Sequence, residues 1–382
     1  MSLQSPSAEA LASLFETRGA SAITMDLLQP AEPYLDTAGE ALRRRIYLTR
    51  GEAGINLCLR PDFTIPVCLH HIERREPLPC RYSYRGLVFR QPRGGEGPRE
   101  LEQAGIEDLG EPNLATADAR ALADALASCE VLGVEADSID VVLGDQGLFE
   151  AFLSALGLPD GWQRRLIRTF GEDRQLDNVM AALANPGSTS LDNVPDGLLE
   201  LAREREEGAL IRAIRDRMEE AGLPPHSGRT PQEVAQRLIE KVATAEGRLS
   251  GGSIDLLKRF LAIDCPLAEA ADAVRALAEG AGLVLDRAIG FFETRNLALQ
   301  AAGVDLSAIT YRAAFGRPID YYTGMVFEVR PKGGGVTLAG GGRYDRLMTL
   351  LGAEERIPAV GFSLWLARLK EHVRVANEGA AA

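Results

Sequence analysis

The sequence is poor in basic residues, in aromatic residues and in cysteine. Lys and Arg total 42 against 55 Asp and Glu, which gives a formal net charge of −13. Binding to nucleic-acid phosphates depends on clustered Lys and Arg, so this balance disfavours a general nucleic-acid binder. Aromatic residues make up only 6% of the chain, and just two of them are tryptophan. We therefore expect no nucleic-acid partner.

The cysteines exclude two further classes of protein. They are odd in number, scattered, and never form a C-x-x-C pair, which argues against a disulfide framework and a zinc site and indicates a reducing compartment. No apolar run is long enough to span a bilayer, and no N-terminal stretch joins a basic start to an apolar core. We expect a cytoplasmic protein without a membrane partner, metal or cofactor. The cysteines are Cys58, Cys68, Cys80, Cys129 and Cys265.

The chain is long enough for two or three domains, since it has 382 residues of which 46% are hydrophobic. Strand and helix patterns are mixed in residues 1–155 and again in residues 286–382. In residues 156–285, apolar residues recur at helical spacing, without a strand of convincing length. The sequence therefore predicts an α+β core with an inserted helical domain.

Two segments near the C-terminus form the most informative pattern: Gly316–Gly324 (GRPIDYYTG) and Gly340–Asp345 (GGGRYD). Between them, Met325–Arg330 alternates apolar with bulky or charged residues, and Val336–Ala339 is a second β-prone run. This predicts a hairpin whose two strands are each capped by one of the motifs. A tyrosine-rich strand end or a flexible glycine turn explains either motif alone, but poorly explains both in this order.

An earlier segment, Leu59–Pro66 (LRPDFTIP), places an acid and a hydroxyl two residues apart just after a predicted strand. In an extended conformation, Asp62 and Thr64 would lie on one face and could bind a ligand ammonium together. An Asx-type turn at Pro61 and Asp62 is an equally good interpretation of the segment alone.

A strand, loop and strand arrangement follows. Tyr82–Gln91 is a predicted strand that ends near Arg90, and Leu101–Glu107 returns after a glycine-rich loop. On the returning strand Gln103 and Glu107 share one side, so both can point into the pocket that Arg90 enters. A surface hairpin joined by salt bridges is the alternative interpretation.

Together these segments resemble histidyl-tRNA synthetases, which are class II aminoacyl-tRNA synthetases. The resemblance covers about residues 8–155 and 286–370. It implies a class II aminoacyl-tRNA synthetase-like antiparallel sheet core flanked by helices. By motif position, it also implies that Asp62, Thr64 and Gln103 hold the α-ammonium of histidine and that Arg90 binds its carboxylate.

The imidazole end of that site is implied by the same resemblance. Glu107 and Tyr322 would bind the ring, and a carboxylate with a phenol can discriminate an imidazole from other rings. Arg317 falls where the synthetases have an arginine that stabilises charge during adenylation. Asp320 and Tyr321 would support the pocket wall.

The ATP side departs from the synthetase pattern. Pro92 stands where the synthetases have a glutamate that contacts adenine, and it offers no side-chain hydrogen bond. In the third motif, Gly361–Leu369, Trp365 replaces a small residue against which adenosine packs, so an indole would fill the nucleotide space. Arg368 is retained, but its acidic neighbour is Ala367. The resemblance therefore implies a degenerate ATP site.

Synthetases continue into an anticodon-binding domain, which we do not expect here because only Lys370–Ala382 follow. This combination is similar to the regulatory subunits of ATP phosphoribosyltransferase. It implies a non-catalytic protein of the first step of histidine biosynthesis, needed for activity of a short-form catalytic subunit and for feedback inhibition by L-histidine. Two alternatives stay open: a histidine-adenylating ligase, and a histidine-sensing module with another partner.

The region Leu42–Ile72 resembles the first motif of class II synthetases, which builds a dimer interface. Ile65, Val67 and Leu69 are apolar beyond what one face of a strand needs. The sequence therefore predicts a homodimer within a larger hetero-oligomer.

Overall fold

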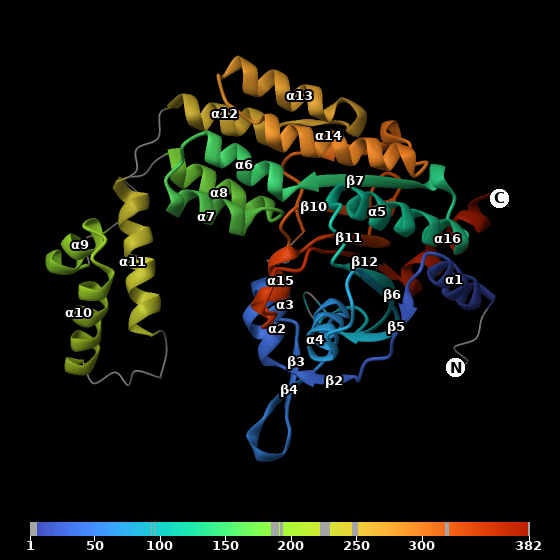
Figure 1. Ribbon diagram of the computed structural model, residues 1–382, viewed down its shortest axis with the longest axis horizontal. Helices are drawn as coiled ribbons and strands as arrows, with labels where there is room; N and C mark the ends of the chain where they lie inside the picture. Colours follow the sequence, from blue (N-terminus) through green and yellow to red (C-terminus); the bar gives the residue numbers. More distant parts are fainter. Residues whose placement is uncertain are drawn as a thin grey trace. The chain divides into compact units, whose positions relative to one another are not determined.

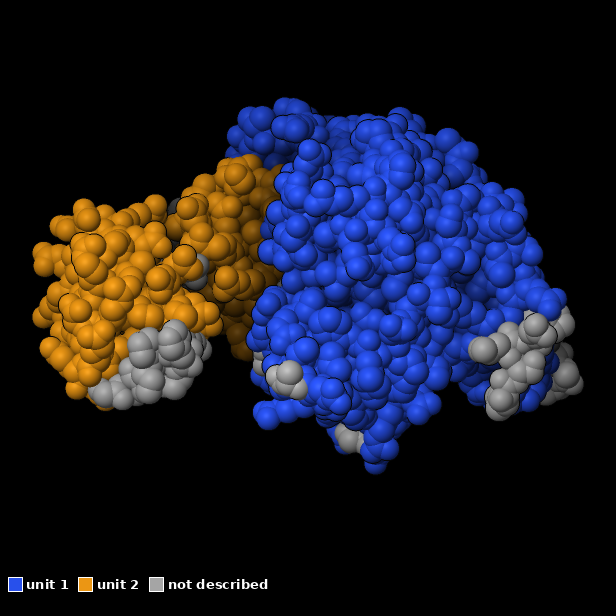
Figure 2. All heavy atoms as spheres, turned by 60° about the horizontal axis from the view of Figure 1, so that its bottom comes forward, with its two compact units in different colours: residues 1–149, 261–382 blue, residues 150–260 orange. Residues whose placement is uncertain are grey.

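The computed structural model describes residues 6–92, 94, 96–184, 191, 194–221, 230–246, 251–317 and 321–380. Contacts divide the chain into two compact units (Figure 2), which we call the sheet unit (residues 1–149 and 261–382) and the helical unit (residues 150–260). The sequence pattern predicted the insertion at residues 156–285. Residues 261–285 instead belong to the sheet unit, where they form a strand and a helix.

A nine-stranded sheet forms the centre of the sheet unit within the described residues. Its pairings are antiparallel except for β1 with β5 and β7 with β9. An α+β fold built on a largely antiparallel sheet is confirmed. In sheet order the strands are β1 (Ser21–Ala22), β5 (Cys80–Phe89), β6 (Glu100–Leu109), β12 (Ala359–Trp365), β11 (Ala339–Arg343), β10 (Met325–Pro331), β7 (Ile139–Asp145), β9 (Ile309–Arg312) and β8 (Asp264–Pro266).

Helices cover one face of this sheet (Figure 1). α5 (Leu114–Val131) packs on β6, β11 and β12, and its Ala117 and Ala121 contact Val360 of β12. Because side chains alternate along a strand, the neighbour Gly361 lies on the opposite face. The remaining covering helices are α1 (Pro6–Thr17), α13 (Leu267–Gly280), α14 (Asp286–Ala301) and α16 (Leu366–Ala380).

The opposite face of the sheet packs against a second set of elements around one large core. In sequence order these are β2 (Leu28–Pro30), α2 (Glu32–Thr37), α3 (Gly39–Arg43), β3 (Tyr47–Arg50), β4 (Asn56–Leu59), α4 (Thr64–Arg74) and α15 (Asp345–Leu350). The three strands among them form a separate sheet in the order β2-β4-β3. The core buries six tyrosines, an unusual number of hydroxyls for an apolar core, and they lie near the predicted binding residues: Tyr34, Tyr82, Tyr84, Tyr321, Tyr322 and Tyr344.

One prediction about this region is wrong. The segment that contains Ile65, Val67 and Leu69 is helix α4, not a strand, and the side chains of Ile65 and Val67 are completely buried inside their own chain. They therefore cannot contribute to a subunit interface.

The predicted hairpin near the C-terminus is present, but one of its strands is misplaced. β10 pairs with a strand that starts at Ala339, so the glycine run is itself the strand, and Val336–Leu338 precede it. A Cβ on Gly341 would lie 2.2 Å from the carbonyl oxygen of Gly361 on the next strand. Glycine is therefore required here for close backbone packing rather than for a turn.

The helical unit has its own cores. Phe152 and Phe260 stack with their ring centroids 4.2 Å apart, and Leu210 and Ala235 are fully buried in another cluster. Its helices are α6 (Gln146–Ala155), whose first turn belongs to the sheet unit, α7 (Asp160–Thr169), α8 (Asp173–Ala184), α9 (Asp196–Arg203), α10 (Glu207–Glu220), α11 (Pro231–Glu246) and α12 (Gly251–Leu261). Short 3-10 turns elsewhere are η1 (Glu52–Gly54), η3 (Ala136–Ser138) and η5 (Leu306–Ala308).

Candidate functional site

Glu107 of β6 lies at the centre of a buried polar site on the face opposite α5. Its side chain is 1% exposed, and Oε1 accepts hydrogen bonds from Thr64 Oγ1 (2.8 Å) and the Tyr84 hydroxyl (3.2 Å). The Tyr344 hydroxyl donates to Oε2. Burial raises the pKa of Glu107 to about 7, although these hydroxyls oppose the shift. The site thus contains a carboxylate that is held in place by hydroxyl donors from three different elements.

Glycines clear the sheet surface for the side chains of this site. A Cβ on Gly361 would lie 1.8 Å from Glu107 Oε2, and one on Gly342 would lie 2.9 Å from Tyr322 Cε1. Gly340 is similarly close to the guanidinium of Arg317. The glycine run therefore makes room for binding side chains to lie on the sheet.

Two buried acceptors in the site have no donor. Asp62 Oδ2 and Gln103 Oε1 are both buried, and neither has a hydrogen-bond partner among the described residues. Burial raises the pKa of Asp62 to about 6, and the charge of Arg90 opposes that shift. Buried polar groups are normally paired, so unpaired acceptors indicate that a donor is supplied from outside the chain.

The predicted extended conformation of the Asp62 segment is wrong. Thr64 is the first residue of helix α4, and Asp62 lies in the preceding turn, where its Oδ1 accepts from the backbone N–H of Ile65 at 3.3 Å. This is the turn interpretation, in which an aspartate satisfies a free amide at a helix start. The turn still leaves the second carboxylate oxygen unpaired inside the site.

Arg90, directly after β5, is a cation without a carboxylate partner. Its Nε donates to the carbonyl oxygen of Pro61 at 2.7 Å, and within the described chain no carboxylate lies within ion-pair distance of it. Burial lowers the pKa of Arg90 to about 10, while the charge of Asp62 raises it. A half-buried guanidinium in this state is a strong site for an anion.

Arg317 and Tyr322 complete the other end of the site. Arg317 Nη1 donates to the Tyr322 hydroxyl at 2.7 Å, and its Nε donates to Glu328 at 3.2 Å. Because the Tyr322 oxygen accepts from Arg317, its own O–H is left to donate. The ring of Tyr321 lies 5.3 Å from that of Tyr322, and Asp320 falls outside the described residues.

The residues of the expected nucleotide side are also in contact with this site. Trp365 is 6% exposed and pairs with Gln103 across β12 and β6. The guanidinium groups of Arg90 and Arg368 lie 4.9 Å and 4.7 Å from its ring centroid. Pro92 is half-buried just after β5, and Ala367 is exposed on α16.

Sequence reasoning overlooked several residues of the site. Tyr84 pairs with Gly105 between Gln103 and Glu107, and its hydroxyl also lies 2.9 Å from Ser363 Oγ. Tyr344 was part of the glycine motif but received no role. Both could have been found from the alternation of side chains along a strand. Tyr84 is two positions after Tyr82, which pairs with Glu107, and Tyr344 is two positions after Gly342, so each lies on the face of the site.

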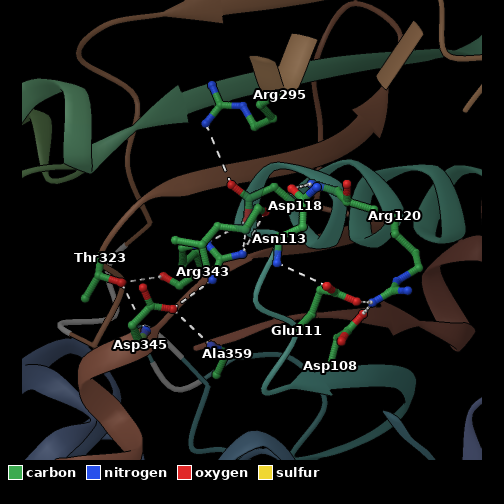
Figure 3. Close-up of polar contacts among 12 residues, drawn as sticks. Asp108, Glu111, Asn113, Asp118, Arg120, Arg295, Thr323, Arg343, Asp345 and Ala359 are labelled. Atoms are coloured by element: carbon green, nitrogen blue, oxygen red, sulfur yellow. Dashed lines mark hydrogen bonds and ion pairs between the residues drawn. The ribbon is translucent and has the colours of Figure 1, made fainter. Parts of the chain in front are cut away.

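A buried ion network lies on the α5 face of the sheet (Figure 3). Arg343 donates to Asp118 and to Asp345, each at 2.8 Å, and Arg343 and Asp345 flank Tyr344 in the sequence. The backbone N–H of Thr323, next to Tyr322, donates to the carbonyl oxygen of Arg343 at 2.8 Å. Arg295, which is fully buried, bonds to Asp145 in the same layer at 2.5 Å.

The described part of the chain contains neither a candidate metal site nor a candidate membrane-spanning helix. No three His, Cys, Asp or Glu side chains among the described residues are grouped so that they could hold a metal ion. None of the described helices has the length and apolar character that crossing a membrane requires.

The sequence matches a family model described as Histidyl-tRNA synthetase over residues 4–221 and 269–369. A curated protein of Allorhizobium ampelinum called "ATP phosphoribosyltransferase regulatory subunit" is 53% identical over 364 residues, which cover 95% of this chain and 96% of that protein. The chain belongs to the family of ATP phosphoribosyltransferase regulatory subunits. Relatives of the same name from Agrobacterium fabrum (52% identical, 93% of this chain and 94% of the relative) and Rhizobium meliloti (49%, 94% and 94%) agree.

Solved structures have the fold of this family. A Bacillus halodurans protein described as an ATP phosphoribosyltransferase regulatory subunit/histidyl-tRNA synthetase has a TM-score of 0.63 at 19% identity, over 96% of this chain and 78% of that one. A histidyl-tRNA synthetase from Nostoc has a TM-score of 0.61 at 16% identity, over 97% of this chain and 71% of that one. The predicted class II synthetase fold and family are confirmed.

Proposed function

We propose that this chain is a non-catalytic regulatory subunit that binds the catalytic subunit of ATP phosphoribosyltransferase, supports its activity in histidine biosynthesis, and makes it sensitive to histidine. The observation that supports a histidine site best is the unpaired guanidinium of Arg90 close to the unpaired acceptors of Asp62 and Gln103. A free amino acid has one carboxylate and one ammonium on the same carbon. It therefore complements all three groups at once.

The other end of the site suits an imidazole. A neutral imidazole has one N–H donor and one nitrogen acceptor. Glu107 supplies an acceptor, and Tyr322 supplies a donor because its oxygen already accepts from Arg317. A phenyl or aliphatic side chain could neither donate to Glu107 nor accept from the Tyr322 O–H, and it would leave that buried O–H without the acceptor that an imidazole supplies.

The competing function is a histidine-adenylating ligase, and the retained Arg90, Arg317 and Arg368 favour it. The indole of Trp365 opposes it: the ring is buried, and the resemblance to synthetases implies that adenosine would pack at this position. Both functions use the same amino-acid site and differ only on the nucleotide side. A nucleotide-dependent assay therefore distinguishes them.

We expect the chain to bind L-histidine and not ATP, measured by titration calorimetry with each ligand. The same preparation should show no histidine-dependent exchange of pyrophosphate into ATP. Exchange at an appreciable rate would establish the ligase instead. Co-purification then identifies the partner: a phosphoribosyltransferase that travels with this chain should be less active alone than in the complex.

We further propose that the chain forms a homodimer through the sheet β2-β4-β3. Large apolar side chains are exposed on one face of it and beside it, with Leu28 at 50% and Ile55 at 58%, whereas Leu48, at 60%, lies on the other face. Such exposure is typical of a surface that a partner covers. Light scattering of the isolated chain should give a dimer, and Leu28→Glu should give a monomer. Val375→Glu, which changes a similarly exposed residue on α16, is the control; a parent that is monomeric at micromolar concentration contradicts the proposal.

A further inference from the structure

Two arginines contact the indole ring of Trp365. The guanidinium carbons of Arg90 and Arg368 both lie within 5 Å of its ring centroid, and the indole is 6% exposed. A cation over the face of a tryptophan is attracted by the ring, and more strongly when water is excluded. Arg368 is also fixed by a hydrogen bond from Nη1 to the carbonyl oxygen of Thr337 at 2.7 Å.

The orientation of the Arg90 guanidinium depends on this contact more than that of Arg368 does. Its hydrogen bond to the Pro61 carbonyl uses Nε, and no hydrogen bond among the described residues uses Nη1 or Nη2. An arginine side chain has several rotatable bonds, so one bond at Nε leaves the plane of the guanidinium poorly fixed. Contact with the indole supplies the second constraint. The two Nη groups remain available as a fork for a carboxylate.

The position of the indole in the sheet brings the two Nη groups of Arg90 close to the acceptors that would bind the ligand's ammonium. Trp365 pairs directly with Gln103 across β12 and β6, and Gln103 has the unpaired acceptor. The charge of Asp62 also acts on Arg90. The groups that complement a carboxylate and an ammonium therefore meet beside one aromatic ring.

We propose that Trp365 is a positioning residue for amino-acid recognition: its indole holds the guanidinium of Arg90 in the orientation that binds the ligand's α-carboxylate. The inference rests on the proposed amino-acid site. The same side chain that fills the nucleotide space would then make the remaining half of the site a better receptor for a free carboxylate. Such a receptor suits an effector that is bound and released unchanged.

The test compares L-histidine with L-histidinol, which has the same ring and ammonium but no carboxylate. By calorimetry, Trp365→Ala should weaken histidine binding by about 10-fold and histidinol binding by less than about 2-fold. Trp365→Phe retains an aromatic face and should recover most of the histidine affinity. Equal losses for the two ligands, or an unchanged histidine affinity in Trp365→Ala, would overturn the inference.

A matched control separates positioning from a general loss of packing. Leu364 is the neighbouring buried residue on β12 and faces the other side of the sheet, so Leu364→Ala should leave the ratio of the two affinities unchanged. If the parent chain binds neither ligand, the proposed histidine site fails. If it binds both and only the Trp365 ratio is unchanged, the positioning role alone fails.

Fluorescence gives a readout that does not require an alanine variant. The chain has two tryptophans, so in Trp162→Phe the only indole emission comes from Trp365. Histidine should change this emission, because its carboxylate would bind the guanidinium that lies over the ring, and histidinol should change it much less. The same response to both ligands would contradict the inference.

Discussion

Replacing Glu107 with glutamine is expected to raise the histidine concentration that half-inhibits the reconstituted complex by at least about 10-fold. A hydrogen bond to a charged group contributes about 1.5–3 kcal/mol, which corresponds to roughly 10-fold to 150-fold in affinity. Glutamine has the same shape, so the packing around Thr64, Tyr84 and Tyr344 is retained. An effector inhibits only through its different affinity for two states of the complex, so weaker binding appears directly as weaker inhibition.

The measurement is phosphoribosyl transfer by the complex over a range of histidine concentrations, with each variant normalised to its own uninhibited rate. Glu102→Gln is the control, because Glu102 is on the same strand but bonds to Arg85, away from the site. Tyr322→Phe should act in the same direction as Glu107→Gln, because it removes the donor to the imidazole. If both variants remain as sensitive to histidine as the parent, the effector binds elsewhere in the complex.

Residues on regular strands could be placed from the sequence, because alternation is a local rule. It put Gln103 and Glu107 on one side of β6, and both are buried on that side of the sheet. The rule failed for Thr64, whose hydroxyl is fixed by Glu107, a partner 43 residues away. The prediction for the glycine run failed for a different reason. Glycine favours turns, but these glycines form a strand because the neighbouring strands pack too closely for a side chain.

The buried ion network could not have been predicted at all. Asp118 and Arg343 are 225 residues apart in the chain. The local pattern around each predicts a helix or a strand, but it does not predict which residue the side chain pairs with. At the start of α5, the side chain of Asn113 accepts from the exposed amide of Thr116, so Asp118 is not needed as a cap. An acidic residue near the start of a helix is usually exposed to solvent and interacts favourably with the helix dipole, so its sequence position gives no sign of a buried ion pair. The pairing becomes visible only when the sheet brings α5 and β11 together.

Replacing Asp118 with alanine is expected to lower the free energy of unfolding of the sheet unit by about 3–5 kcal/mol. Asp118 is fully buried, and the change leaves Asp345 as the one described carboxylate that pairs with the Arg343 guanidinium. Burial raises the pKa of Asp118 while Arg343 and Arg295 oppose the shift, so the carboxylate depends on these two cations. Removing one member of such a network leaves a buried charge without full compensation, which costs more than the lost contact.

Urea denaturation of the Trp162→Phe chain measures this loss in the correct unit, because Trp365 is then the only indole and lies in the sheet unit. Asp272→Ala removes an ion pair with Arg275 on the surface of α13 and is the control, since solvent already screens that pair. Asp118→Asn should lose less than Asp118→Ala, because the amide oxygen still accepts a hydrogen bond from Arg343. An Asp118→Ala loss no larger than that of Asp272→Ala would mean that the network does not hold α5 to the strand behind the site. The tyrosines that contact Glu107 would then be positioned by the packing of the core alone.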